Sequence, residues 1–152
     1  MIHLKRFLTV VVFLISTSVW AQSSDEIKAL AEQGDKLAQA KVGAMYLLGR
    51  NGMELNEKEA AQWITKAAEQ GMIEAQVLLA AMYDRGMGVT GNKDAATRWY
   101  QKAADQGHPM SMAILGKNPT AKGSVQFSYE SMRLNAARSV PREYANKILF
   151  MK

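Results

Sequence analysis

The sequence predicts an all-α fold: a short right-handed α-solenoid of antiparallel helix pairs with C-terminal capping helices. One observation behind this prediction is self-similarity, because the chain repeats itself after about 36 residues. The other is periodicity, because alanine-rich stretches in each copy place apolar side chains at the i, i+3, i+4 and i+7 positions of a helix. Such helix pairs bury their apolar faces only against neighbouring pairs, so a stacked array is expected.

The repeat is clearest at the end of each unit. The sequence at 68–71 (AEQG) returns at 104–107 (ADQG) and is already present at 31–34 (AEQG). Each of these segments closes on a glycine, the residue that most easily adopts the left-handed conformation ending a helix. Trp63 returns as Trp99 within the preceding helices.

Each complete unit reads as two helices. The first spans about 35–48 and 72–85, and the second spans about 57–69 and 93–105, each second helix preceded by an asparagine in the N-cap position. The predicted divisions are residues 1–21 as a signal peptide, 22–34 as an N-terminal capping half-repeat, 35–71 and 72–107 as complete repeats, 108–123 as a truncated third repeat and 124–152 as a basic C-terminal helical segment.

The first 21 residues have the pattern of a secretory signal peptide. Lys5 and Arg6 precede the apolar run FLTVVVFLI, and cleavage is expected after Ala21. A membrane anchor is the alternative, but nine helical residues rise only about 14 Å, roughly half of the hydrocarbon core. The protein is therefore expected to be exported, to the periplasm or out of the cell.

The C-terminal part is basic. Residues 117–152 hold seven Lys or Arg and two Asp or Glu. Residues 22–116 hold ten Lys or Arg and twelve Asp or Glu. Two helices are expected at 124–138 and 142–151, separated by Pro141. They either cover the third unit or order only on a partner. Their charge leaves weak contact with an anionic membrane open, while nucleic acid is not an expected partner of an exported protein.

Composition excludes most catalytic chemistry. The chain has no Cys, which removes disulfides, thiolate metal sites and cysteine nucleophiles. Once the signal peptide is removed, His108 is the only histidine, and its place before Pro109 indicates a structural role at a helix start. No nucleophile is paired with a base, so we expect no catalytic residue, no cofactor and no metal.

One group of motifs resembles a known family. Gly86-Met87-Gly88-Val89, then Asn92, then WYQKAADQG at 99–107 are similar to the Sel1-like repeat, a relative of the tetratricopeptide repeat. The resemblance covers about residues 29–116. The first copy differs from the family pattern in the loop at 52–55, and the third copy no longer follows the pattern at 117–119.

The resemblance implies a protein-binding module. The family that the chain resembles includes envelope scaffolds and regulators, host-interaction factors and periplasmic immunity proteins that neutralise a toxin. Some relatives bind or hydrolyse β-lactams, but they depend on paired cysteines that this chain lacks, so hydrolase activity is the least favoured reading. The expected partner is another protein of unspecified identity, and the oligomeric state stays open.

The expected binding surface is the stripe of each first helix that points away from the alanine core. In stacked helix pairs, first helices line the concave side, where an apolar anchor with a polar rim holds a partner segment. The alternative is that a neighbouring helix or the C-terminal segment fills this groove. The candidate protein-binding residues are Leu37, Lys41, Leu48, Glu74, Leu78, Arg85, Met110 and Ile114.

Overall fold

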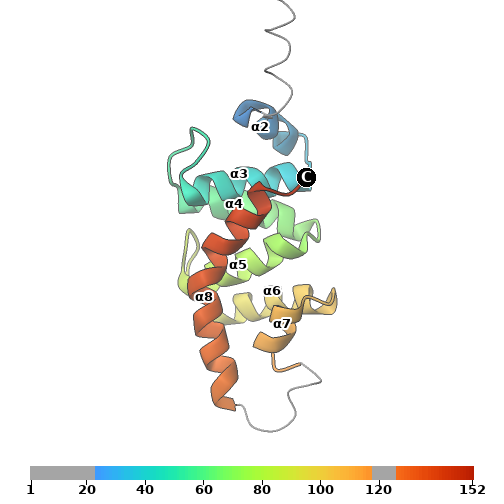
Figure 1. The fold of residues 1–152 in the computed structure, drawn as a ribbon, viewed down its shortest axis with the longest axis vertical. Coiled ribbons are helices and arrows are strands. Elements are labelled where there is room, and N and C mark those ends of the chain that lie inside the picture. The colour runs from blue at the N-terminus through green and yellow to red at the C-terminus, as the bar shows by residue number, and fades with distance from the viewer. Residues whose placement is uncertain (1–22, 118–125) are drawn as a thin grey trace, which may run out of the picture.

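The computed structural model describes residues 23–117 and 126–152, with side chains in the second range from residue 134 on except at 137. These residues form helices and no strands, stacked along one axis (Figure 1). The predicted signal peptide and residues 118–125 lie outside the described ranges. The helices are α2 (Ser24–Glu32), α3 (Lys36–Leu48), α4 (Glu57–Glu69), α5 (Ile73–Arg85), α6 (Lys93–Asp105), α7 (Pro109–Ile114) and α8 (Gln126–Leu149).

Helices α3 with α4, and α5 with α6, are the predicted antiparallel pairs. The predicted caps are present, because the side chains of Asn56 and Asn92 accept hydrogen bonds from the backbone of the third residue after each, at 3.1 and 2.9 Å. The same asparagines close the loop before them. Their N–H groups donate to the carbonyls of Tyr46 and Tyr83, both at 2.9 Å. Equivalent residues therefore make equivalent bonds in both units.

Gly88 lets one repeat lie directly against the next. Its φ is +65°, and a Cβ atom built there would lie 1.9 Å from the carbonyl oxygen of Glu57. Only glycine allows the loop after α5 to approach the first turn of α4 so closely.

A second link between units is made by glutamines. Gln39 and Gln76 are buried, and each donates to a carbonyl at the end of the preceding helix at 3.2 Å. Gln70 and Gln106, which end α4 and α6, then donate to the side-chain oxygens of Gln39 and Gln76 at 2.8 and 2.7 Å. Each buried amide thus has partners on both sides, as buried polar groups require.

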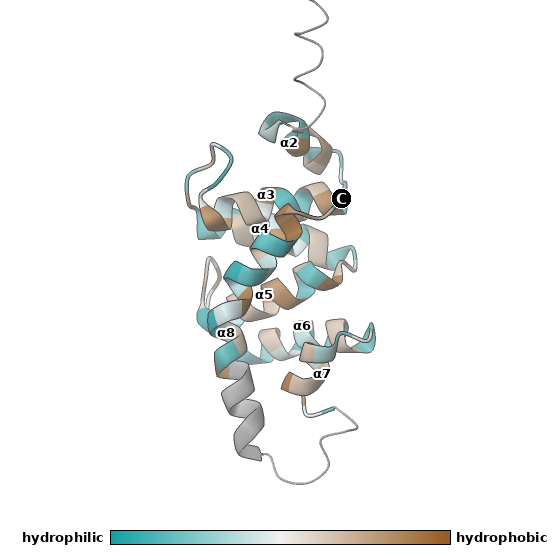
Figure 2. Cartoon of the chain, viewed as in Figure 1, coloured by the Kyte–Doolittle hydropathy of each residue, from teal (hydrophilic) through white to brown (hydrophobic). Residues whose placement is uncertain are grey.

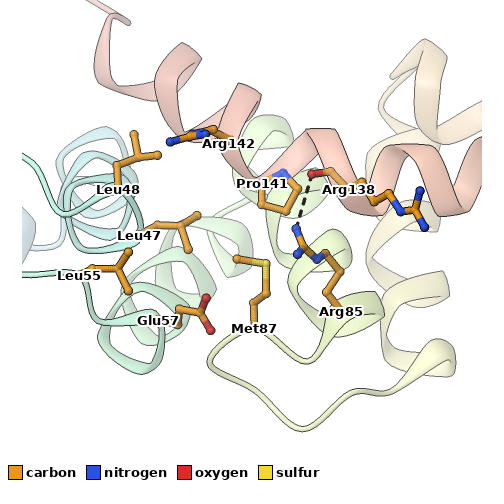
Figure 3. Close-up of a pocket in the computed structure, with 9 residues that line it drawn as sticks. All are labelled: Leu47, Leu48, Leu55, Glu57, Arg85, Met87, Arg138, Pro141 and Arg142. Atoms are coloured by element: carbon orange, nitrogen blue, oxygen red, sulfur yellow. Dashed lines mark hydrogen bonds between the residues drawn. The ribbon is translucent and has the colours of Figure 1, made fainter.

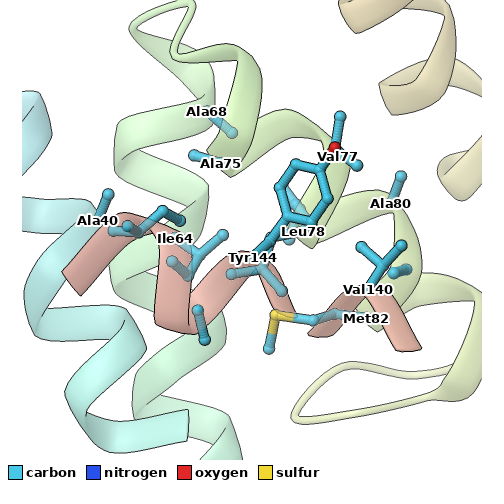
Figure 4. Close-up of a cluster of buried hydrophobic side chains, with 14 of the residues drawn as sticks. Ala40, Ile64, Ala68, Ala75, Val77, Leu78, Ala80, Met82, Val140 and Tyr144 are labelled. Carbon is cyan, nitrogen blue, oxygen red and sulfur yellow. The ribbon is translucent and has the colours of Figure 1, made fainter. Parts of the chain in front are cut away.

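Helix α5 forms the centre of the core. Every side chain from Ala75 to Met82 is buried, because α4, α6 and α8 surround it. Figure 4 shows Leu78 and Val77 of α5 beside Tyr144 and Val140 of α8 in one apolar cluster. In Figure 2, the coloured part of α8 carries both hydrophilic and hydrophobic residues, and α5 behind it carries hydrophobic residues.

The C-terminal segment differs from the prediction of two helices broken at Pro141. It is one helix, α8, with Pro141 inside it. A proline in a helix interior costs about 3 kcal/mol, because it lacks an N–H and crowds the preceding turn. Packing of α8 against α3, α5 and α7 offsets that cost. Beside the proline, the Arg85 guanidinium lies 3.5 Å from the Arg138 carbonyl and donates to it.

Candidate functional site

The face lined by the first helices is covered from within the chain. Helix α8 contacts α3, α5 and α7, crossing the array on that face (Figure 1). Its buried side chains at Val140, Tyr144, Ala145 and Ile148 pack into the core. The C-terminal segment is therefore the occupant of most of the groove, which is the alternative that the sequence left open.

Several candidate residues are consequently not free. Leu78 is 0% exposed, so the expectation that it is an exposed anchor is wrong; it packs in the same cluster as Tyr144. Ile114 is buried as well, and Met110 is partly buried against the core. Glu74 pairs with Lys147 of α8, with 3.2 Å between the carboxylate and the ammonium.

Leu48 and Arg85 remain in an open pocket of about 330 Å³ (Figure 3). We name it the arginine pocket. It lies where the loop after α3, the loop after α5 and the middle of α8 meet. It is lined by Leu47, Leu48, Leu55, Glu57, Arg85, Met87, Arg138, Pro141 and Arg142.

The floor of the arginine pocket is apolar. Leu55 is 65% exposed, a large apolar side chain without cover in the described structure. Leu47 and Met87 lie near it in Figure 3. Isolated exposed leucines are common on protein surfaces. Leu55 instead borders a hollow together with other apolar side chains, and burying such an apolar surface against a partner is energetically favourable.

The α8 side of the pocket is basic. Arg138 and Arg142 are one helical turn apart on α8, and Arg85 reaches α8 between them. Within the described ranges, none of the three arginines forms an ion pair with a carboxylate. Figure 3 shows Arg142 extending toward Leu48, Arg138 pointing outward beyond Arg85, and Glu57 across the floor from α8.

Leu37 and Lys41 border a different pocket, of about 270 Å³, at the N-terminal end of the array. Residues of α2 and α3 line it together with the C-terminal Lys152. The eight candidate residues are thus not brought together into one site.

His108 lies at the junction of α7 and α8. Its Nδ1 accepts a hydrogen bond from the backbone N–H of Ser111 at 3.2 Å and lies 2.9 Å from the Ser111 hydroxyl, making His108 the N-cap of α7. Because Nδ1 is an acceptor, the ring proton belongs on Nε2, which donates to the Tyr144 hydroxyl at 2.7 Å.

The electrostatics at this junction favour neutral rings. Burial first, and then the nearby Lys147 charge, lower the pKa of His108 from 6.5, against an opposite effect of Glu74. Burial, with Glu143 and Glu74, raises the pKa of Tyr144 to about 12. Neither group is poised to exchange protons at neutral pH, so the pair serves to attach α8 to the third unit.

Among the residues that the structure describes, no three His, Cys, Asp or Glu side chains gather as metal ligands would. In the same ranges, no helix combines the length and apolar character needed to cross a membrane.

Sequence reasoning missed the arginine pocket as a unit. Leu55 lies in the loop where the first copy departs from the repeat, and Arg142 lies far along the chain on α8. The signal in the sequence was the loop at 52–55, which differs from the repeat pattern. In a regular array, a loop that differs from its equivalents is a candidate binding site.

These features define a class: a short α-solenoid of helix pairs whose inner face is covered by its own C-terminal helix. The Sel1 repeat model matches residues 36–72 and 73–108. A crystal structure of a Sel1 repeat protein from Oxalobacter formigenes is 32% identical, with a TM-score of 0.55, covering 82% of this chain and 94% of that one. The chain belongs to the Sel1 repeat family.

Other relatives are larger. A protective antigen of uropathogenic Escherichia coli strains, with an SLR fold, is 26% identical at a TM-score of 0.57, covering 90% of this chain and 30% of that one. A chitin synthase regulator of Saccharomyces cerevisiae is 41% identical over 65 residues, which are 42% of this chain and 9% of that protein. Sel1 repeat proteins are generally non-catalytic modules for protein interaction.

Proposed function

We propose that this protein is an exported, non-enzymatic interaction module of the bacterial cell envelope, and that it binds another protein at the arginine pocket. The observation that carries the proposal is the contrast within the predicted binding stripe. Helix α8 covers Leu78, whereas Leu48 and Arg85 stay in an open pocket beside exposed Leu55. An apolar centre with a polar rim is the usual anatomy of a protein-binding surface.

The module acts as an adaptor, a regulator or a toxin-immunity factor. The yeast relative is described as a regulator of an enzyme, which supports a regulatory role for repeats of this kind. Export is supported by the first 21 residues, with their basic start, apolar run and cleavage pattern before Gln22.

The test is crosslinking in cells from position 55, where a photoreactive residue replaces Leu55. We expect one dominant protein partner, identified by mass spectrometry, whose purified form binds the wild-type chain and loses binding to Leu55→Glu. Leu134 supplies the matched control, because it is 57% exposed on α8 but does not line the pocket. Equal capture from positions 55 and 134, or unchanged binding by Leu55→Glu, would contradict the proposed site.

A second candidate function is peripheral association with anionic membranes. It is favoured by exposed apolar and basic side chains in the C-terminal part of the chain, namely Leu134, Arg138, Arg142 and Lys147 on α8 and Phe150 directly after it. Basic side chains with large apolar ones bind anionic lipid surfaces in a salt-sensitive way. Flotation with vesicles containing phosphatidylglycerol tests it; a protein that never floats, at any salt concentration, excludes it.

A further inference from the structure

We infer that the arginine pocket selects an acidic protein segment, one that carries a large apolar side chain beside one or more carboxylates. This inference rests on the proposed function and specifies the chemistry of the partner. It follows from the two different sides of the pocket, an apolar floor and a basic α8 side.

The floor sets the requirement for an apolar side chain. Leu47, Leu55 and Met87 line the hollow, and Leu55 alone leaves most of its surface in water. Covering this apolar surface is favourable in proportion to the area removed from water. At about 330 Å³ the hollow is near the lower end of the range of ligand pockets, so it accommodates one or two side chains.

The α8 side sets the requirement for carboxylates. Arg138 and Arg142 are both exposed, and neither makes an ion pair within the described residues. Arg85 donates from Nη1 to a backbone carbonyl at the long distance of 3.5 Å, which leaves its other N–H groups available. Guanidinium groups bind carboxylates through paired, charge-assisted hydrogen bonds, and their planar fork fits that geometry.

Glu57 gives the site a direction. It lines the pocket across the apolar floor from α8, as Figure 3 shows. A bound acidic segment is therefore attracted toward the α8 side and repelled from the Glu57 side. The carboxylates of the partner are expected to follow α8, with the apolar side chain turned down between Leu55 and Met87.

The experiment uses labelled synthetic peptides and the mature protein. The reference peptide has a central phenylalanine flanked by glutamates. Three control peptides replace the glutamates by glutamines, the glutamates by lysines, or the phenylalanine by alanine. Fluorescence anisotropy should show the reference peptide binding about tenfold more tightly than each control. Salt at about 0.5 M should weaken that binding, because the arginines are exposed.

Variants of the protein place the effect in the pocket. Arg142→Gln and Leu55→Ala should each weaken binding of the reference peptide several-fold. Arg98→Gln is the matched control, since Arg98 is exposed on α6 and does not line the pocket. Arg142 and Leu55 are both exposed, so these variants should keep the wild-type circular dichroism and melting transition.

Several outcomes would overturn the inference. These are equal binding of all four peptides, unchanged binding by Arg142→Gln, or a pocket filled by a second copy, seen as a concentration-dependent dimer lost in Leu55→Glu. Binding to anionic vesicles but to no peptide also rejects it. If crosslinking from position 55 captures a neutral or basic segment, this inference fails while the proposed function stands. If the acidic peptide binds but no protein is captured in cells, the proposed function fails instead.

Discussion

The Nε2 atom of His108 lies 2.7 Å from the hydroxyl of Tyr144, and this contact joins the start of the third unit to the C-terminal helix. The same imidazole caps α7 through Nδ1. One side chain thus stabilises a helix start and attaches α8. The cap requires an unprotonated Nδ1, so it is lost when the ring takes up a second proton.

Folding stability should therefore fall on mild acidification. The folded pKa of His108 lies below 6.5, so the unfolded chain takes up the proton first as the pH drops. The free energy of unfolding should decrease as the pH falls from 6.5 to the folded pKa, with little change above it. Urea unfolding of the protein at a series of pH values measures this.

His108→Asn is the control for that titration. Asparagine keeps an N-cap acceptor but does not titrate, so the variant should be less stable at neutral pH and show a flatter profile over the same range. If the two profiles have the same slope, His108 is not the group responsible.

Gly88→Ala should destabilise the fold by more than about 2 kcal/mol, because positive φ and a backbone collision act together. The new Cβ would lie 1.9 Å from the Glu57 carbonyl oxygen. Gly52→Ala is the matched comparison, with a φ of +81° and no atom within 4 Å of the added carbon. It should lose about 1 kcal/mol, from the backbone conformation alone. Equal losses in thermal or urea unfolding would show that the contact with α4 is not rigid.

Gln76→Ala should cost about 1 to 3 kcal/mol, because it removes two hydrogen bonds between units, the one donated to the Ala68 carbonyl and the one accepted from the Gln106 amide. Gln62→Ala, at an exposed position on α4, should change stability by less than about 0.5 kcal/mol. Urea unfolding of the two variants gives the comparison. A small effect at Gln76 would mean that water replaces the glutamine link between units.

Ile148→Ala should cost about 2 to 5 kcal/mol, as expected when a wholly buried isoleucine leaves a cavity. Phe150→Ala, which removes a larger side chain that is 79% exposed, should have almost no effect on unfolding. If Ile148→Ala is as mild as Phe150→Ala, then α8 does not pack on the array in solution and orders only on a partner.

The helix pairs could be predicted because their signals are local. Asn56 and Asn92 mark the start of each second helix, and the observed helices begin at Glu57 and Lys93 as expected. Capping and apolar spacing depend on residues within one or two turns of each other, so a single sequence contains the information.

The cover of the inner face could not be predicted in the same way. Periodicity places Leu78 on the outer stripe of its helix, but what lies over that stripe depends on Tyr144, a distant residue. A proline usually ends a helix, but α8 continues through Pro141 because the surrounding turns pack against other helices. The arginine pocket combines three separate segments, so its composition follows from the tertiary fold alone.

The path of α8 has a consequence for how the molecule unfolds and assembles. A simple repeat array behaves as a row of nearest neighbours and loses its end units independently. Here one helix touches units that are not adjacent, so loosening any of them releases contacts made to the others. Unfolding should proceed as one cooperative transition rather than by fraying from the ends. A chain threaded from its N-terminus into another compartment would complete its core only after its last residues, including Ile148, had followed.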